Sequence, residues 1–307
     1  MVGSNATMKI YINTQNIRRT KIIMLLFLLL TPLAVGCREN TTNEKPVHIS
    51  KDPFLLAYLR QYPTIKIDTS ENIVIQRIQY KDFDKKETYQ GSENPSEFSY
   101  TIFLLQDGVF SGIERVFTGT PARRYRGVDI TRNQEGFITN IAVDSGSISP
   151  PIVNHTYTKN GNVVIANNGL SRGAVAAVLV EEENKFSYWN SYQVYNRRDM
   201  PVSVMEFING EDVIFTMYTA NIISSRSHFI NGILMKKEFF VGETPRTETY
   251  TVSSGIGELI VTKPDGEIIQ RSVLERKLNS AGLLEYEGVR LETGEGYAYF
   301  FTKDMVQ

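Results

Sequence analysis

The residue with the most distinctive chemistry in this chain is Cys37, the only cysteine among 307 residues. A single thiol cannot form an internal disulfide, so its nucleophilic sulfur is free for another reaction. Cys37 comes immediately after Gly36, at the end of the strongest apolar run of the sequence, residues 22–35. We therefore interpret Cys37 as a site of covalent modification.

The segment before Cys37 is typical of an export signal. Residues 18–21 supply positive charge ahead of the apolar run, and that run is shorter than the roughly 20 residues of a transmembrane helix. The sequence Ala34-Val35-Gly36-Cys37 resembles the cleavage site of bacterial lipoproteins, although leucine is usual where Ala34 stands. The resemblance implies that Cys37 accepts a diacylglycerol, that the bond after Gly36 is cut, and that acyl chains such as palmitate anchor the protein. The alternative is an ordinary cleaved signal followed by an unmodified cysteine.

This interpretation divides the chain into a signal peptide (residues 1–36), a lipidated cysteine with a flexible tether (37–50) and a β-rich exported domain (51–307). The tether is polar and lacks periodicity. Loss of the signal removes four basic and no acidic residues, so the net charge falls from -1 to about -5. An acidic balance argues against nucleic acid as a partner.

Histidine chemistry is sparse, because the chain has only His48, His155 and His228. Hydrolysis by a Ser/His/Asp triad or by a bound metal needs histidines that converge with carboxylates. None of the three lies in such a motif, so we expect no metal site, no cofactor and no enzymatic activity.

One further motif is a candidate for catalysis. The sequence Asp144-Ser145-Gly146-Ser147 after an apolar stretch resembles the active-site turn of aspartic proteases. In that family two aspartates share a proton. This chain has no second turn of the kind, so catalysis would require a homodimer, and Asp-Ser-Gly is also ordinary turn chemistry.

Two other clusters are candidates for binding. Residues 186–195 include Phe186, Trp189 and three tyrosines, which would stack on a glycan or an apolar ligand if exposed, or pack within a sheet. Residues 123–126 and 197–198 hold short basic groups that suit anionic headgroups or a solvated rim.

The elements that must position these residues are mainly strands. Asp52-Pro53 before an apolar stretch predicts a short helix over residues 52–60. Beyond residue 72, β-branched and aromatic runs alternate with turn dipeptides that tolerate positive φ. These dipeptides are Asp107-Gly108, Asn160-Gly161, Asn168-Gly169, Asn209-Gly210, Asn231-Gly232 and Asp265-Gly266. We predict a mainly β fold, an antiparallel meander forming an open or curled sheet or a sandwich, with residues 173–183 as a strand.

The scarcity of catalytic groups favours a non-catalytic envelope lipoprotein with an interaction or structural domain. The alternative is a carrier of a lipid or another hydrophobic ligand in a half-barrel, and a hydrolase centred on Asp144 comes third. Expected partners are the membrane, through the lipid, and an envelope protein or an apolar ligand. Arg38 beside the lipid site lacks the acidic character that retains some lipoproteins at the inner membrane, which favours the outer membrane or cell surface.

Substitution of Cys37 tests the anchor. The variant Cys37→Ala is expected to accumulate as an uncleaved or mislocalised precursor, because no other cysteine can accept the lipid. Metabolic labelling with radioactive palmitate, followed by membrane fractionation, measures this. Label retained by Cys37→Ala would refute the assignment.

Overall fold

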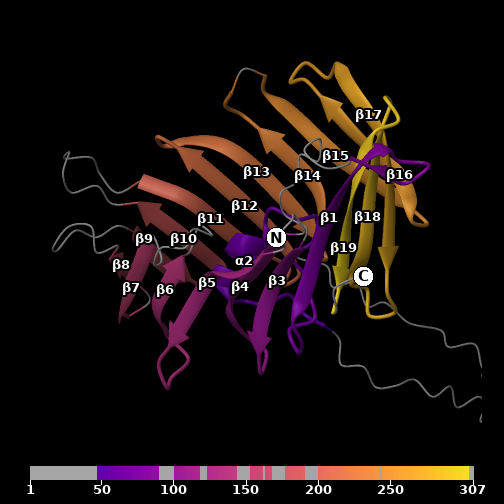
Figure 1. The fold of residues 1–307 in the computed structure, drawn as a ribbon. Helices are drawn as coiled ribbons and strands as arrows, with labels where there is room; N and C mark the ends of the chain where they lie inside the picture. The colour runs from indigo at the N-terminus through magenta and orange to yellow at the C-terminus, as the bar shows by residue number, and fades with distance from the viewer. Residues whose placement is uncertain are drawn as a thin grey trace, which may run out of the picture. The chain divides into compact units, whose positions relative to one another are not determined.

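Strands dominate the chain from residue 73 onward, as the alternation of β-branched residues and turn dipeptides predicts. The structure, a computed structural model, describes residues 47–89, 100–117, 123–143, 153–161, 163–167, 177–190, 200–242 and 244–303. These residues belong to one unit, residues 46–307, and form one α-helix and nineteen β-strands whose pairings are all antiparallel (Figure 1).

The bounds of these elements follow the chain in order. They are α2 (Pro53–Leu59), β1 (Ile73–Asp82), β2 (Glu87–Thr88), β3 (Tyr100–Gln106), β4 (Val109–Phe117), β5 (Arg123–Arg132), β6 (Ile138–Val143), β7 (Val153–Asn160), β8 (Val163–Asn167), β9 (Ala177–Glu182), β10 (Lys185–Asn190), β11 (Met200–Ile208), β12 (Asp212–Thr219), β13 (Ile222–Ile230), β14 (Ile233–Phe239), β15 (Arg246–Ser253), β16 (Ile256–Thr262), β17 (Ile268–Leu278), β18 (Leu284–Leu291) and β19 (Gly296–Thr302).

The sheet closes on itself through β1. One edge of β1 pairs with β19 over residues 74–80, and the start of its other edge pairs with β3 over residues 73–76. From β3 to β19 each strand pairs with the next one in the chain. Among the described residues, 18 strands therefore form a closed antiparallel barrel, and β2 is an extra strand beside the end of β1.

The prediction of an open or curled sheet or a sandwich is therefore wrong. The mainly β content, the antiparallel meander and the short helix before it are confirmed. Closure depends on the pairing of β1 with β19, two strands at opposite ends of the domain. No local turn or side-chain pattern specifies a pairing over that sequence distance.

The turn dipeptides act as predicted where the structure describes them. Positive φ at both residues, the geometry of a type I′ hairpin turn, occurs at Asp107-Gly108, Asn209-Gly210 and Asn231-Gly232. Gly161 and Gly266 also have positive φ, whereas Asn168-Gly169 lies outside the described residues. The stretch 173–183, which the sequence predicts as a strand, contains strand β9 within its described part.

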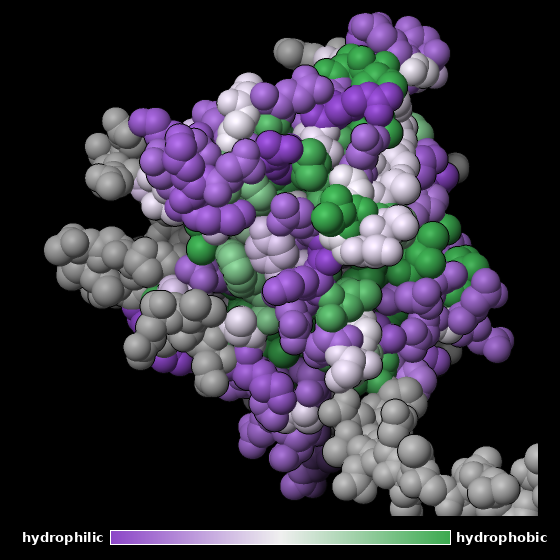
Figure 2. All heavy atoms as spheres, turned by 90° about the vertical axis from the view of Figure 1, so that its right-hand side faces the viewer, coloured by the Kyte–Doolittle hydropathy of each residue, from purple (hydrophilic) through white to green (hydrophobic). Residues whose placement is uncertain are grey.

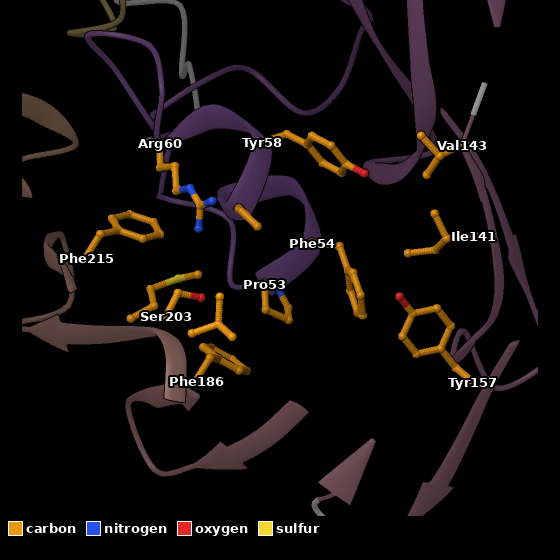
Figure 3. Close-up of a pocket in the computed structure, with 13 residues that line it drawn as sticks. Pro53, Phe54, Tyr58, Arg60, Ile141, Val143, Tyr157, Phe186, Ser203 and Phe215 are labelled. Carbon is orange, nitrogen blue, oxygen red and sulfur yellow. The ribbon is translucent and has the colours of Figure 1, made fainter. Parts of the chain in front are cut away.

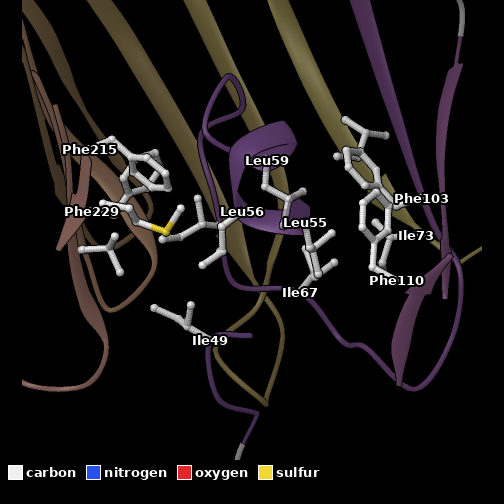
Figure 4. Packing of buried hydrophobic residues seen from close by; sticks show 14 of the residues in the cluster. Ile49, Leu55, Leu56, Leu59, Ile67, Ile73, Phe103, Phe110, Phe215 and Phe229 are labelled. Atoms are coloured by element: carbon white, nitrogen blue, oxygen red, sulfur yellow. The ribbon is translucent and has the colours of Figure 1, made fainter. Parts of the chain in front are cut away.

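Helix α2 lies inside the lumen of the barrel and fills part of it. Leu55, Leu56 and Leu59 on one face of the helix are each at most 1% exposed. They belong to one apolar cluster with residues of opposite walls, including Phe103 on β3 and Phe215 on β12 (Figure 4). A barrel of this strand number is otherwise wide enough to leave an aqueous channel. Within the described ranges, no helix has the length and hydropathy needed to cross a membrane.

The helix is held to the barrel wall at its N-terminus. The Asp52 carboxylate accepts hydrogen bonds from the backbone N–H groups of Phe54 (2.9 Å) and Leu55 (3.4 Å), as an N-cap does. Its second oxygen lies 2.6 Å from the Arg132 guanidinium of β5. Arg132 also donates to the backbone carbonyls of Phe110 and Gly136, so Asp52 joins the helix cap to three segments of the wall.

A charged pair lies inside the barrel as well. The Arg276 Nε donates to Glu287 Oε2 at 2.6 Å, and their side chains are only 5% and 3% exposed. A terminal nitrogen of Arg276 donates to the Leu234 carbonyl, and the guanidinium lies over the Tyr250 ring. Both charges are thus compensated within the lumen.

The outward face of the barrel carries many charged side chains. Since neighbouring residues of a strand point to opposite faces, the buried Leu259 and Phe229 point into the lumen, and Glu258 and His228 point outward. Glu258 pairs with Arg271 across the strands, and His228 pairs with Glu238. Figure 2 shows hydrophilic side chains interspersed with smaller hydrophobic groups on one such face.

Removal of one partner of the buried pair is expected to destabilise the barrel strongly. Glu287→Gln leaves the Arg276 charge buried without an anion, which costs about 3–5 kcal/mol. Glu258→Gln breaks an exposed pair and is expected to cost less than about 1 kcal/mol. Urea unfolding followed by circular dichroism compares the two. Equal losses would show that burial of the pair does not matter.

The link between Asp52 and Arg132 allows the cap and the ion pair to be separated. Asp52→Ala removes both and is expected to lower the free energy of unfolding by about 2–3 kcal/mol. Asp52→Asn keeps a cap acceptor and is expected to lose roughly half of that. Asp129→Asn, at an exposed ion pair with Arg126, serves as the control and is expected to be nearly neutral. A neutral Asp52→Ala would mean that the helix is held by apolar packing alone.

Candidate functional site

Several residues singled out in the sequence lie outside the described residues. These are Gly36 and Cys37 of the lipidation site, Asp144 of the protease-like turn, the tyrosines at 192 and 195, and the basic pair at 197–198. Their roles stay predictions.

The three histidines do not converge on a common site. His48 Nδ1 lies 3.0 Å from Glu211 Oε1, at the turn between β11 and β12. His228 Nε2 lies 2.9 Å from Glu238 Oε2 on the outward face, and His155 is on β7, opposite Ile141 of β6. Within the described ranges, no group of three or more potential ligands is arranged around a metal position.

In the first basic cluster, Arg124 and Arg126 are paired with neighbouring carboxylates. The Nε of Arg124 donates to Glu114 at 2.7 Å, and Arg126 lies 3.0 Å from Asp129. Both arginines are exposed on the outward face of β5. Both are therefore engaged in surface ion pairs, and the side chain of Arg123 lies outside the described part of the structure.

The aromatic stretch contributes one side chain to the lumen. Phe186 on β10 is buried and makes an edge-to-face contact with Phe207 of β11, with ring centroids 5.8 Å apart. Phe186 also faces a cavity beside α2, which we call the inner cavity. The side chains of Tyr188 and Trp189 lie outside the described part of the structure.

The inner cavity is bounded by the second face of α2 and by the wall opposite it. Its volume is about 240 Å³. The lining side chains are mostly apolar or aromatic: Pro53, Phe54, Ala57, Tyr58 and Arg60 of the helix and its C-cap, Ile141 and Val143 of β6, Tyr157 of β7, Phe186 of β10, Val202, Ser203 and Met205 of β11, and Phe215 of β12 (Figure 3).

Helix periodicity explains how the short helix α2 contributes to both the inner cavity and the apolar core. Residues 53, 57 and 60 and residues 54 and 58 recur at spacings of three and four, so they share one side of α2. Leu55, Leu56 and Leu59 occupy the other side and pack in the core. The helix therefore anchors itself with leucines and presents aromatic rings and Arg60 to the cavity.

Among the described residues, Arg60 is the one charged side chain that lines the inner cavity. No described residue supplies an ion-pair or hydrogen-bond partner for its guanidinium, and its burial lowers the pKa of Arg60 below the ordinary value because water is removed from the cation. Arginine stays protonated even so. Figure 3 shows the guanidinium directed towards the side of the cavity where Ser203 and Phe215 lie.

A second cavity of about 320 Å³ adjoins the first. We call it the vestibule. Pro53, Phe54 and Phe186 line both spaces, and the Phe54 ring makes an edge-to-face contact with Tyr157 at 5.5 Å. The vestibule is polar, with Lys51, Asp52, Arg132, Glu135, Lys159 and Glu181 among its lining residues. Phe54 thus stands between a polar outer space and an apolar inner one.

The sequence did not identify Arg60 or Phe54 as functional residues. A phenylalanine and an arginine on a short helix are ordinary in a sequence. Their role depends on the position of α2 inside a closed barrel, which no local pattern reveals. Apolar walls combined with one described cation and few described hydroxyl groups are typical of a small-molecule binding site.

Comparison with known proteins adds little to this description. No protein-family model matches the chain, and no curated protein matches it. Among solved structures, it is similar to the crystal structure of a porin-like protein from Bacteroides uniformis, with 10% sequence identity and a TM-score of 0.37. The alignment covers 78% of this chain and 99% of that protein. A likeness of this degree identifies neither a family nor a function, so the site must be interpreted from its own residues.

Proposed function

We propose that this protein is a lipoprotein of the bacterial cell envelope whose β-barrel binds a compact apolar ligand in the inner cavity without catalysing its conversion. The observation that supports this most is the cavity itself, about 240 Å³ in volume with mainly apolar and aromatic walls. Small-molecule sites are concave, predominantly apolar and equipped with a few polar groups that fix orientation. In this proposal the ligand lies inside a closed barrel, and not in the half-barrel that the sequence analysis considered for a carrier.

The envelope location rests on Ala34-Val35-Gly36-Cys37, and the outward face of the barrel supports a position in water beside the membrane. Ion pairs such as Glu258 with Arg271 point away from the lumen. A basic side chain that faces lipid at the bilayer midplane costs roughly 2–4 kcal/mol in a membrane barrel. We therefore place the outward face of the barrel in water, with the lipid on Cys37 holding the protein to the membrane.

A protein partner is the second candidate, since the sequence favoured an interaction module. Ile222 and Ile256 at strand ends are 62% and 65% exposed. Exposed isoleucines suit contact with another protein. Charged substitutions there would impair co-purification of a partner and leave the cavity intact, so the two candidates are separable.

Filling the inner cavity tests the ligand-binding proposal. Ala57→Phe adds a ring to the cavity face of α2 and is expected to weaken ligand binding at least about tenfold, because the ligand and the ring compete for the same space. The full chain in phospholipid nanodiscs is titrated with the neutral probe para-fluorophenylpropanol, and fluorine NMR is compared with empty nanodiscs.

The matched control is Ala142→Phe, at an outward-facing position of β6 opposite Asp129. This variant is expected to bind the probe as the unsubstituted protein does. The proposal fails if the unsubstituted protein binds neither this probe nor the corresponding acid, para-fluorophenylpropanoate. It also fails if Ala57→Phe binds it equally well while circular dichroism shows both variants folded.

A further inference from the structure

We infer that the ligand of the inner cavity is a monocarboxylate, whose carboxylate group binds Arg60 and the Ser203 hydroxyl and whose aryl or short alkyl body lies against Phe54, Phe186 and Phe215. This inference rests on the proposed binding function and names the chemical class of the ligand.

The first argument is the contrast between Arg60 and two other arginines that face the interior. A further interior arginine, Arg77, has no carboxylate partner but lies over the rings of Tyr297 and Tyr299. Arg132 pairs with Asp52 at 2.6 Å, and Arg276 pairs with Glu287 at 2.6 Å. Arg60 has no such carboxylate among the described residues, although it lines a cavity with apolar walls. A cation removed from water is costly unless an anion compensates it. A bound anion would supply what Asp52 and Glu287 supply elsewhere.

The second argument concerns the charge and shape of that anion. Within the part of the chain that the structure describes, the inner cavity offers one guanidinium and no other cation. A planar guanidinium binds a carboxylate through two parallel hydrogen bonds, and the Ser203 hydroxyl can donate a third. A dianionic phosphate would need further donors or cations. The cavity therefore suits a single negative charge.

The third argument is size. A cavity of about 150 Å³ lined by apolar side chains is known to hold benzene, so 240 Å³ accommodates a body of about one ring with a few further carbons. Phe54, Phe186 and Phe215 present ring faces and edges to it. Aromatic rings pack favourably in offset or edge-to-face contacts, so an arylalkanoate fits the walls as well as the volume.

The experiment compares two ligands that differ only in the head group. The full chain in nanodiscs is titrated with para-fluorophenylpropanoate and with para-fluorophenylpropanol, again by fluorine NMR against empty nanodiscs. We expect the acid to bind roughly 10- to 100-fold more tightly than the alcohol, as a charge-assisted hydrogen bond predicts. In Arg60→Met the preference is expected to disappear, because the side chain keeps its aliphatic stem and loses the cation.

Controls separate this inference from the function on which it rests. Arg271→Met removes an outward-facing arginine and is expected to leave the preference unchanged, while Arg60→Lys is expected to keep part of it. Equal binding of acid and alcohol by the unsubstituted protein would overturn the carboxylate assignment and leave the cavity function standing. A preference retained by Arg60→Met would overturn it as well. If neither compound binds, both proposals fail.

Discussion

The constraint on which the rest of the structure depends is the need to fill the lumen of the barrel. A closed sheet of 18 strands encloses a lumen wider than the side chains of its own walls can fill, and an unfilled apolar lumen would lose dispersion contacts and admit water. The chain solves this with a single short helix, whose leucines contact phenylalanines of opposite walls. One side of that helix completes the core, and the other side leaves the inner cavity.

Two arginines inside the barrel, Arg276 and Arg60, differ in whether described residues compensate their charge. Arg276 is fixed by Glu287, by a backbone carbonyl and by an aromatic ring, so it serves the fold. Arg60 lines the inner cavity and has no described anion as a partner. Desolvation penalises both cations, but only the first is compensated within the described residues. This difference distinguishes a structural charge from one available to a ligand.

Local features of the fold could be predicted from the sequence, and long-range ones could not. Asp52-Pro53 indicates the helix because capping and a fixed proline φ act within one turn, and Asn209-Gly210 indicates a hairpin because positive φ is a property of the residues themselves. Closure by β1 and β19 depends on accumulated twist and on the register of every strand between them. Prediction of the site would have required both the local helix and the long-range closure, since Arg60 becomes a cavity residue only when the barrel closes around α2.

The same closure constrains the order in which the protein can mature. The strand that completes the barrel, β19, is the last of the described strands, and its partner β1 is the first. As the chain is synthesised, β1 therefore appears early, and the edge that pairs with β19 stays unpaired until almost the entire domain has followed. Exposed edges of this kind promote mispairing between molecules, and pairings of such sequence separation form slowly. A chaperone that shields β1 during this interval would protect the protein at the stage when it is most prone to aggregate.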